Sequence, residues 1–220
     1  MHDILDSLDQ RPFVAPAGND SPAYLVLKRT LDIVGALGLL VLFSPIMLAA
    51  LVVLTVTTRG RPIFCQRRVG HCGHQFPMLK FRTMVVDAEA RQADVANEHQ
   101  SGPIFKNRRD PRITRVGRVL RSLSIDEMPQ LLNVLAGHMA LVGPRPPLAK
   151  EVVQYTPWQR RRLSVKPGLT CLWQVSGRSE IGFEDWVRMD IRYIERQSLW
   201  TDLKLLAATP SSVLSRRGAC

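Results

Sequence analysis

Cysteine is scarce in this chain of 220 residues. Its four cysteines are too few and too widely spaced to form the disulfide framework of a secreted protein. The nearby group Cys65, His71, Cys72 and His74 lacks the second pair of ligands that a structural zinc site needs. We therefore expect a protein that works in a reducing compartment.

Acidic residues are also in short supply. The chain has 19 Asp+Glu against 30 Lys+Arg, which gives a formal net charge of +11. Between Arg59 and Arg121 there are 14 basic and 5 acidic residues, so nearly half of the basic residues lie in under a third of the length. Such a balance predicts an anionic partner: phosphates, a nucleic acid or an acidic lipid surface. The alternative for this segment is a solvated or lipid-facing basic surface.

One stretch, residues 33–56, lacks charge altogether. At about 1.5 Å per residue it would form a helix of roughly 36 Å, long enough to cross the hydrocarbon core of a membrane. Pro45, in its middle, has no backbone N–H, and its ring clashes with the preceding turn. We expect the proline to divide the run into two helices of about a dozen residues each. Ser44 is expected to bond the backbone groups that the proline frees.

Basic residues on both sides of this run favour a re-entrant anchor. Lys28 and Arg29 precede it, and four arginines follow it, at positions 59, 61, 67 and 68. The positive-inside rule then places both ends in the cytoplasm. We expect a helix–break–helix hairpin over residues 23–58, between a flexible tail at 1–22 and a compact cytoplasmic catalytic domain at 59–220. A proline-kinked spanning helix is the alternative.

The rest of the chain predicts a predominantly α fold with a small β-hairpin. Residues 61–84 read as two short strands around a glycine-rich turn at residues 70–73. Residues 157–163 combine a tryptophan with three arginines, which predicts an interfacial amphipathic helix on anionic membrane lipid. Its alternative is a solvated basic helix. Trp200 could likewise lie at the interface or pack in the core.

Two adjacent carboxylates, Asp126 and Glu127, lie in a segment with a helical apolar period, residues 121–137. Pro129 fits best in a first helical turn, so we expect this helix to begin near Asp126. Both carboxylates would then lie at the positive end of a helix dipole, close to Arg121. Such surroundings keep a carboxylate ionised, which suits a nucleophile or a metal ligand.

The same pair also has a structural interpretation, because Ser124 and the second carboxylate have the spacing of a capping box. A Gly-Pro-Arg-Pro loop favours the interpretation of the pair as a nucleophile or metal ligand. This loop holds the guanidinium of Arg145 in a fixed direction that suits a phosphate. Residues 165–178 add a Pro-Gly turn, Gln174 and Arg178, which together suit a nucleotide.

Five motifs follow one another along the chain: "KRTLDIVGALGLLVLFSPIM", "KFRTM", "RSLSIDEMPQLLNVLAGHMALVGPRP", "KPGLTCLWQVSGR" and "WTDLKLL". In this order they resemble the bacterial sugar transferases, the monotopic polyprenyl-phosphate phosphoglycosyl transferases. The resemblance covers about residues 25–217, and the chain is similar to the short form that starts exopolysaccharide repeat units. One departure is Cys171, where the family usually has glycine. A positive φ at that position would strain a cysteine.

The resemblance implies a polyprenyl-phosphate hexose-1-phosphate transferase at the cytoplasmic face of the bacterial inner membrane. It implies that Asp126 accepts a sugar-1-phosphate, of galactose or glucose, from a UDP-sugar, releasing UMP, and that undecaprenyl phosphate then takes it from this phosphosugar-aspartyl intermediate. Glu127 is expected to hold Mg²⁺ (or Mn²⁺), together with Asp126, or to pair with Arg121. The residues expected to contact the phosphates or the rest of the substrate are Arg82, Arg121, Arg145, Lys166, Gln174 and Arg178.

A second class of function is a basic, membrane-tethered nucleic-acid or lipid-binding module without catalysis. It would explain the charge and the apolar run, but not the Asp-Glu pair and the two arginine motifs in one chain. The sequence shows no base-stacking aromatics and no recognition helix, so we expect no nucleic-acid partner. It carries no prediction of oligomeric state.

Overall fold

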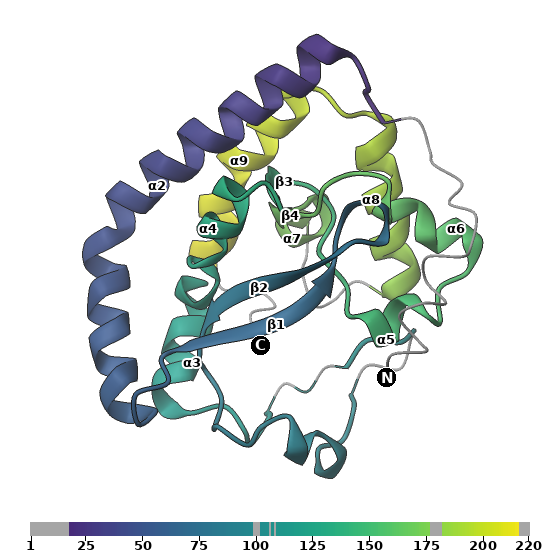
Figure 1. The fold of residues 1–220 in the computed structure, drawn as a ribbon. Helices are drawn as coiled ribbons and strands as arrows, with labels where there is room; N and C mark the ends of the chain where they lie inside the picture. The colour runs from purple at the N-terminus through teal and green to yellow at the C-terminus, as the bar shows by residue number, and fades with distance from the viewer. Residues whose placement is uncertain (1–17, 99–101, 106, 108, 177–181, 216–220) are drawn as a thin grey trace.

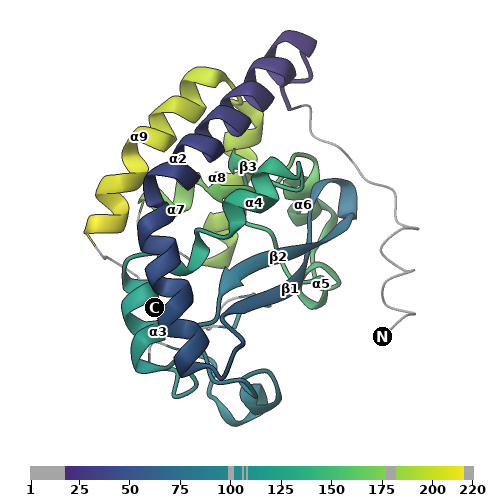
Figure 2. The same cartoon turned by 60° about the vertical axis from the view of Figure 1, so that its left-hand side comes forward.

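The structure is a computed structural model that describes residues 18–98, 102–105, 107, 109–176 and 182–215. Most of the predicted tail, residues 1–17, and Arg178 lie outside the described residues. Helices dominate, and the longest one, α2, lies along one side of the other elements (Figures 1 and 2). The predicted class, mainly α with a small hairpin, is confirmed.

The helices, strands and turns have the following bounds along the chain. The α-helices are α2 (Pro22–Thr57), α3 (Arg115–Ser122), α4 (Gln130–Leu135), α5 (Ala149–Val152), α6 (Pro157–Arg160), α7 (Leu172–Ser176), α8 (Phe183–Glu195) and α9 (Leu199–Leu214). The strands are β1 (Ile63–Val69), β2 (Gln75–Phe81), β3 (Ala140–Val142) and β4 (Gly168–Thr170). Short 3₁₀ turns are η1 (His71–Gly73), η2 (Ala90–Asp94), η3 (Ile125–Glu127) and η4 (Arg161–Leu163).

Helix α2 runs through Pro45 without interruption, so the predicted division into two helices is wrong. The N–H that proline lacks would have bonded the carbonyl of Val41, one turn earlier. The hydroxyl of Ser44 donates to that carbonyl instead, at 2.8 Å, as expected of this serine. Because the carbonyl is satisfied, the helix continues, and it bends about midway instead of breaking into two helices (Figures 1 and 2).

Only a narrow stripe of α2 is buried, at Tyr24, Lys28, Asp32, Ala36, Ala50 and Leu54. The helix is long and apolar enough to cross a membrane, yet only 11% of its most apolar window is buried. Both halves of the stripe contact the same domain: Lys28 pairs with Asp202 of α9, and Leu54 packs against Phe81 and Leu120. The remaining apolar surface of α2 is free to face an apolar environment.

The predicted hairpin is confirmed. Strands β1 and β2 pair antiparallel from Ile63 opposite Phe81 to Val69 opposite Gln75. On one face of β2, Phe76 and Met78 join the main core cluster, which also contains side chains of α4 and β3. The hairpin therefore lies against the helix that follows the two carboxylates.

A second, parallel pair of strands was not predicted. Strand β3 pairs with β4, with Ala140 opposite Gly168 and Val142 opposite Thr170. The two backbone segments are so close just beyond β3 that a side chain on Gly168 would lie 2.0 Å from the backbone nitrogen of Gly143. Glycine is needed there for close approach. This pair sets the course of the Gly-Pro-Arg-Pro loop.

The segment 157–163 folds as a short helix and a 3₁₀ turn, and its placement on a membrane surface stays a prediction. Helix α6 lies on the other side of the domain from α2, and η4 continues it (Figure 1). Arg162 is 3% exposed, forms an ion pair with Asp190 and donates to the hydroxyl of Tyr155 at 3.0 Å. A buried carboxylate partner explains why this arginine points inward instead of toward lipid. Trp200, by contrast, is exposed on α9, next to α2.

Arg162→Met should destabilise the protein by about 3–5 kcal/mol, because Asp190 would be left buried and unpaired. Thermal unfolding in detergent measures the loss. The double change Arg162→Met with Asp190→Leu should recover most of it. If Arg162→Met instead left the unfolding temperature unchanged and weakened binding to anionic vesicles, the interfacial interpretation would be right.

Candidate active site

An open cleft of about 1120 Å³ lies beside the hairpin. Six of the predicted site residues line it: Arg82, Arg121, Asp126, Glu127, Arg145 and Gln174. Lys166 is not among the described residues that line the cleft, and its pKa is lowered by burial and by the charge of Arg29, against that of Asp32. Arg178 lies outside the described residues. The structure thus brings together six residues from four separate segments of the chain.

The two carboxylates lie on the 3₁₀ turn η3 and not on an α-helix. Ser124, which precedes the turn, has a left-handed backbone with φ of 55°, and its side chain caps nothing. Helix α4 begins only at Gln130, after Pro129. The predicted helix start near Asp126 and the capping-box alternative are therefore both wrong. Both carboxylates nevertheless line the cleft from this turn, which follows directly on the left-handed Ser124.

Glu127 is held by two cations. Its Oε1 accepts from the ammonium of Lys80 at 2.7 Å and lies 3.7 Å from the guanidinium of Arg145. Burial acts to raise the pKa of Glu127, but Lys80, Arg145 and Arg68 outweigh it and lower the pKa to about 2. The expected pairing with Arg121 is absent among the described contacts, since the Nε of Arg121 donates to Thr83 at 2.9 Å.

Asp126 differs from its neighbour. It is 7% exposed, and within the described part of the chain its carboxylate forms no hydrogen bond or ion pair. Burial has the largest effect and raises the pKa of Asp126 above the ordinary 3.8. The charge of Lys80 lowers this pKa and the charge of Glu127 raises it, and the net shift is upward. The expected stabilisation of its charge by a helix dipole fails, because one 3₁₀ turn has little dipole. Once ionised, this carboxylate is free to act on a substrate.

Positive charge exceeds negative charge around the pair. Arg68 is partly buried, donates to the carbonyl of Pro146 at 3.2 Å, and has its pKa lowered to about 10, first by burial and then by Arg145. With Lys80 and Arg121, these cations outnumber the two carboxylates. A diphosphate would restore the balance, and guanidinium groups match its oxygens.

Sequence reasoning missed Lys80, Arg68 and Gln130. Lys80 follows Met78 by two residues on β2, so strand alternation places a lone lysine on the face that enters the core. Alternation on β1 marks Arg68 in the same way. Gln130 is 3% exposed, and its Nε2 has no hydrogen-bond partner among the described residues. No local signal identified Gln130.

Two predicted residues of the cleft have hydrogen-bond partners outside the carboxylate pair. Arg82 donates to the backbone carbonyls of Arg61 and Ile63, so its guanidinium is held by the start of β1. Gln174 accepts from the thiol of Cys171 at 3.0 Å. Cys171 is buried and is not among the described residues with positive φ, so the feared strain at this position is absent.

The donor set fits a divalent ion only in part. Among the described residues no group of three or more His, Cys, Asp or Glu side chains is placed to hold a metal. Mg²⁺, however, is usually bound through one or two carboxylates, with substrate phosphates and waters completing the shell. Asp126, which has no hydrogen-bond or ion-pair partner in the described ranges, and the second oxygen of Glu127 are suitable ligands of that kind.

Comparison with known proteins adds independent findings. A family model described as bacterial sugar transferase matches residues 23–216 of the chain. The galactosyl transferase CpsE of Streptococcus agalactiae is 46% identical over 201 residues, which is 90% of this chain and 44% of CpsE. The undecaprenyl-phosphate galactose phosphotransferase of Salmonella typhimurium is 43% identical over 203 residues, 88% of this chain and 41% of that protein. The chain thus spans less than half the length of these two relatives.

A shorter relative matches over nearly its whole length. The exopolysaccharide production protein ExoY of Rhizobium meliloti is 37% identical over 217 residues, which is 94% of this chain and 95% of ExoY. The matched region contains the cleft, the carboxylate pair and α2.

Lys80→Met should raise the pKa of Glu127 from about 2, because burial of that carboxylate would be less opposed. Carbon-13 NMR of labelled glutamate in detergent micelles measures the midpoint. Lys204→Met, at an exposed lysine of α9, is the control and should leave it unchanged. Since the pKa is depressed on folding, ionised Glu127 stabilises the fold above the ordinary 4.5, and this stabilisation is lost as the pH falls toward 2. A midpoint unmoved by Lys80→Met would assign the depression to the arginines alone.

Proposed function

Because the chain belongs to the bacterial sugar transferase family, we propose that it transfers a hexose-1-phosphate, of galactose or glucose, from a UDP-sugar to undecaprenyl phosphate. The observation that carries the proposal is the buried, unpartnered carboxylate of Asp126 in a cleft lined by Lys80 and several arginines. A carboxylate can attack phosphorus when cations neutralise the phosphate oxygens that would repel it.

The proposed reaction has two displacements at one phosphorus atom. The carboxylate of Asp126 attacks the phosphorus that bears the sugar, and the bond to the UMP oxygen breaks, so UMP leaves with the electron pair. An oxygen of undecaprenyl phosphate then attacks the same phosphorus, and the bond to Asp126 breaks. Lys80, Arg68 and Arg145 neutralise the phosphate oxygens in both steps. Asp126 and Glu127 would hold Mg²⁺ or Mn²⁺, which would supply further neutralisation of the phosphate charge.

Both ends of α2 support a location on one side of the membrane. The contacts of Lys28 with Asp202 and of Leu54 with Phe81 attach the two halves of α2 to the same domain. A helix that crossed a bilayer could not keep both contacts, because its halves would lie on different sides of the lipid. We therefore infer a bent, re-entrant anchor at the cytoplasmic face of the bacterial inner membrane, with its exposed apolar surface among anionic lipids.

Asp126→Asn should reduce UMP release by roughly 10³-fold or more, because the amide cannot act as the nucleophile. Membranes that contain the protein would be supplied with Mg²⁺, undecaprenyl phosphate and, one at a time, UDP-galactose, UDP-glucose and UDP-N-acetylglucosamine. Asp185→Asn, at an exposed aspartate on α8, is the matched control and should keep wild-type turnover. The same panel identifies the sugar.

Wild-type turnover by the Asp126→Asn protein would remove Asp126 from the role of nucleophile. If no donor releases UMP and the protein binds nucleic acid in a salt-sensitive manner that Asp126→Asn does not change, the binding module would be the better assignment.

Pro45→Leu should favour a straight helix that spans the membrane, because the leucine restores the N–H that proline lacks. Asp20→Cys, with Cys65 and Cys72 replaced by serine, would be labelled in intact cells by a maleimide that does not cross the inner membrane. We expect the thiol at position 20 to be protected in the protein that keeps Pro45, and to be labelled in a measurable fraction of the Pro45→Leu molecules. Labelling of this thiol in the protein that keeps Pro45 would exclude the re-entrant anchor.

A further inference from the structure

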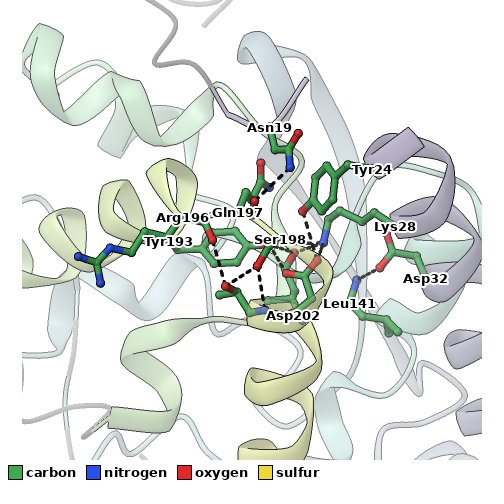
Figure 3. A network of polar contacts seen from close by, with 12 residues as sticks. Asn19, Tyr24, Lys28, Asp32, Leu141, Tyr193, Arg196, Gln197, Ser198 and Asp202 are labelled. Atoms are coloured by element: carbon green, nitrogen blue, oxygen red, sulfur yellow. Dashed lines mark hydrogen bonds and ion pairs between the residues drawn. The ribbon is translucent and has the colours of Figure 1, made fainter. Parts of the chain in front are cut away.

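Four polar side chains meet in the core between α2, α8 and α9 (Figure 3). Lys28 donates to Asp202 at 2.8 Å, and Asp202, which is 0% exposed, also accepts from Tyr24 at 3.3 Å and from Tyr193 at 2.7 Å. The proposed reaction uses none of these four residues. Burying a carboxylate costs free energy of desolvation unless the carboxylate is paired, so the burial of Asp202 calls for an explanation.

The network includes one backbone atom of β3, the carbonyl of Val142. Both the ammonium of Lys28 and the hydroxyl of Tyr193 lie 3.1 Å from it. Tyr193 has one proton and lies closer to Asp202, so the proton goes to the carboxylate. The three N–H groups of Lys28 then have three acceptors: Asp202, the Val142 carbonyl and the Tyr193 oxygen at 3.4 Å. Lys28 is therefore the donor that holds Val142.

A second residue of α2, one turn further on, holds the preceding residue of β3. The carboxylate of Asp32 accepts from the backbone N–H of Leu141 at 2.8 Å (Figure 3). One edge of β3 pairs with β4, and these side chains of α2 bind consecutive backbone groups of β3. The position of β3 is thus set by the anchor helix.

Only two residues separate Val142 from Arg145, and they leave little slack. A side chain on Gly143 would lie 2.5 Å from the carbonyl of Lys166, so the loop is pressed against its neighbour. Pro144 and Pro146 fix the backbone on either side of Arg145. A shift of β3 would move the guanidinium that lies 3.7 Å from Glu127.

The same helix also fixes the element that follows the carboxylate pair. Arg29 donates to the carbonyls of Val134 and Leu135, at 2.7 and 2.8 Å, and so caps the C-terminal end of α4. Helix α4 begins three residues after Glu127. Two adjacent residues of α2, Lys28 and Arg29, therefore hold the elements that carry the two partners of the contact between Arg145 and Glu127.

We propose that Lys28, with Asp202 and Asp32, is a positioning residue for Arg145, so that docking of the anchor helix on the domain also assembles the phosphate site. This inference rests on the proposed function. It predicts a defect in donor binding that depends on Arg145, which a simple loss of stability would not produce.

Lys28→Met should raise the KM for the UDP-sugar that the panel identifies by about tenfold or more, with a smaller change in the KM for undecaprenyl phosphate. Leu54→Ala removes buried contacts from the other half of α2 and should lower the unfolding temperature with no change in KM. The decisive measurement is a double-mutant cycle with Arg145→Lys, which keeps the charge but loses the planar fork. If Lys28 acts through Arg145, Lys28→Met should raise KM by less than about threefold in the Arg145→Lys protein.

Effects that multiply in the double variant would overturn the proposal, as would an unchanged KM in Lys28→Met protein. If Lys28→Met protein does not fold, Asp32→Ala and Asp32→Asn take its place: asparagine keeps an acceptor for the Leu141 N–H, so it should preserve KM, whereas alanine should raise it. Equal KM values for these two variants would also overturn the proposal. Absence of turnover in the wild-type protein would instead count against the proposed function.

Discussion

A buried ion pair, Lys28 with Asp202, joins the apolar helix α2 to the rest of the protein. Removing two charges from water is costly, and the cost is offset only where each donor and acceptor finds a partner. The three N–H groups of Lys28 do so, and one of their acceptors is the backbone of β3. The helix can thus present an apolar surface to its surroundings and still be fixed to the domain, because two of its charged residues, Lys28 and Asp32, lie on the buried stripe.

The two neighbouring carboxylates of the cleft have opposite properties although they share one turn. Lys80 and Arg145 lie beside Glu127 and depress its pKa, whereas burial raises the pKa of Asp126. Environments that separate the pKa values of two titratable groups allow them to take different roles. By occupying Lys80, Glu127 leaves Asp126 without a hydrogen-bond or ion-pair partner among the described residues, as the proposed attack on phosphorus requires.

Features that depend on nearby residues were predictable. The hairpin follows from alternation around a glycine-rich turn, and the bond from Ser44 to Val41 follows from the N–H that Pro45 lacks. Family motifs located the two carboxylates and Arg145. Lys80 was also within reach, because strand alternation places it on the inward face of β2. For these features, the neighbours that matter lie within a few positions in the chain.

The sequence by itself thus determined the apolar run, the hairpin and the residue types of the cleft. Only the tertiary structure decided which charges pair. Arg162 belongs to a basic segment that is typical of a membrane surface, but it pairs with Asp190. Lys28 precedes the apolar run like an ordinary flanking charge, but it binds Asp202, 174 positions away. The physical reason is that a charge adopts the environment in which it is best compensated. Three-dimensional packing decides which partner a charge meets, and the local periodicity of the sequence does not indicate it.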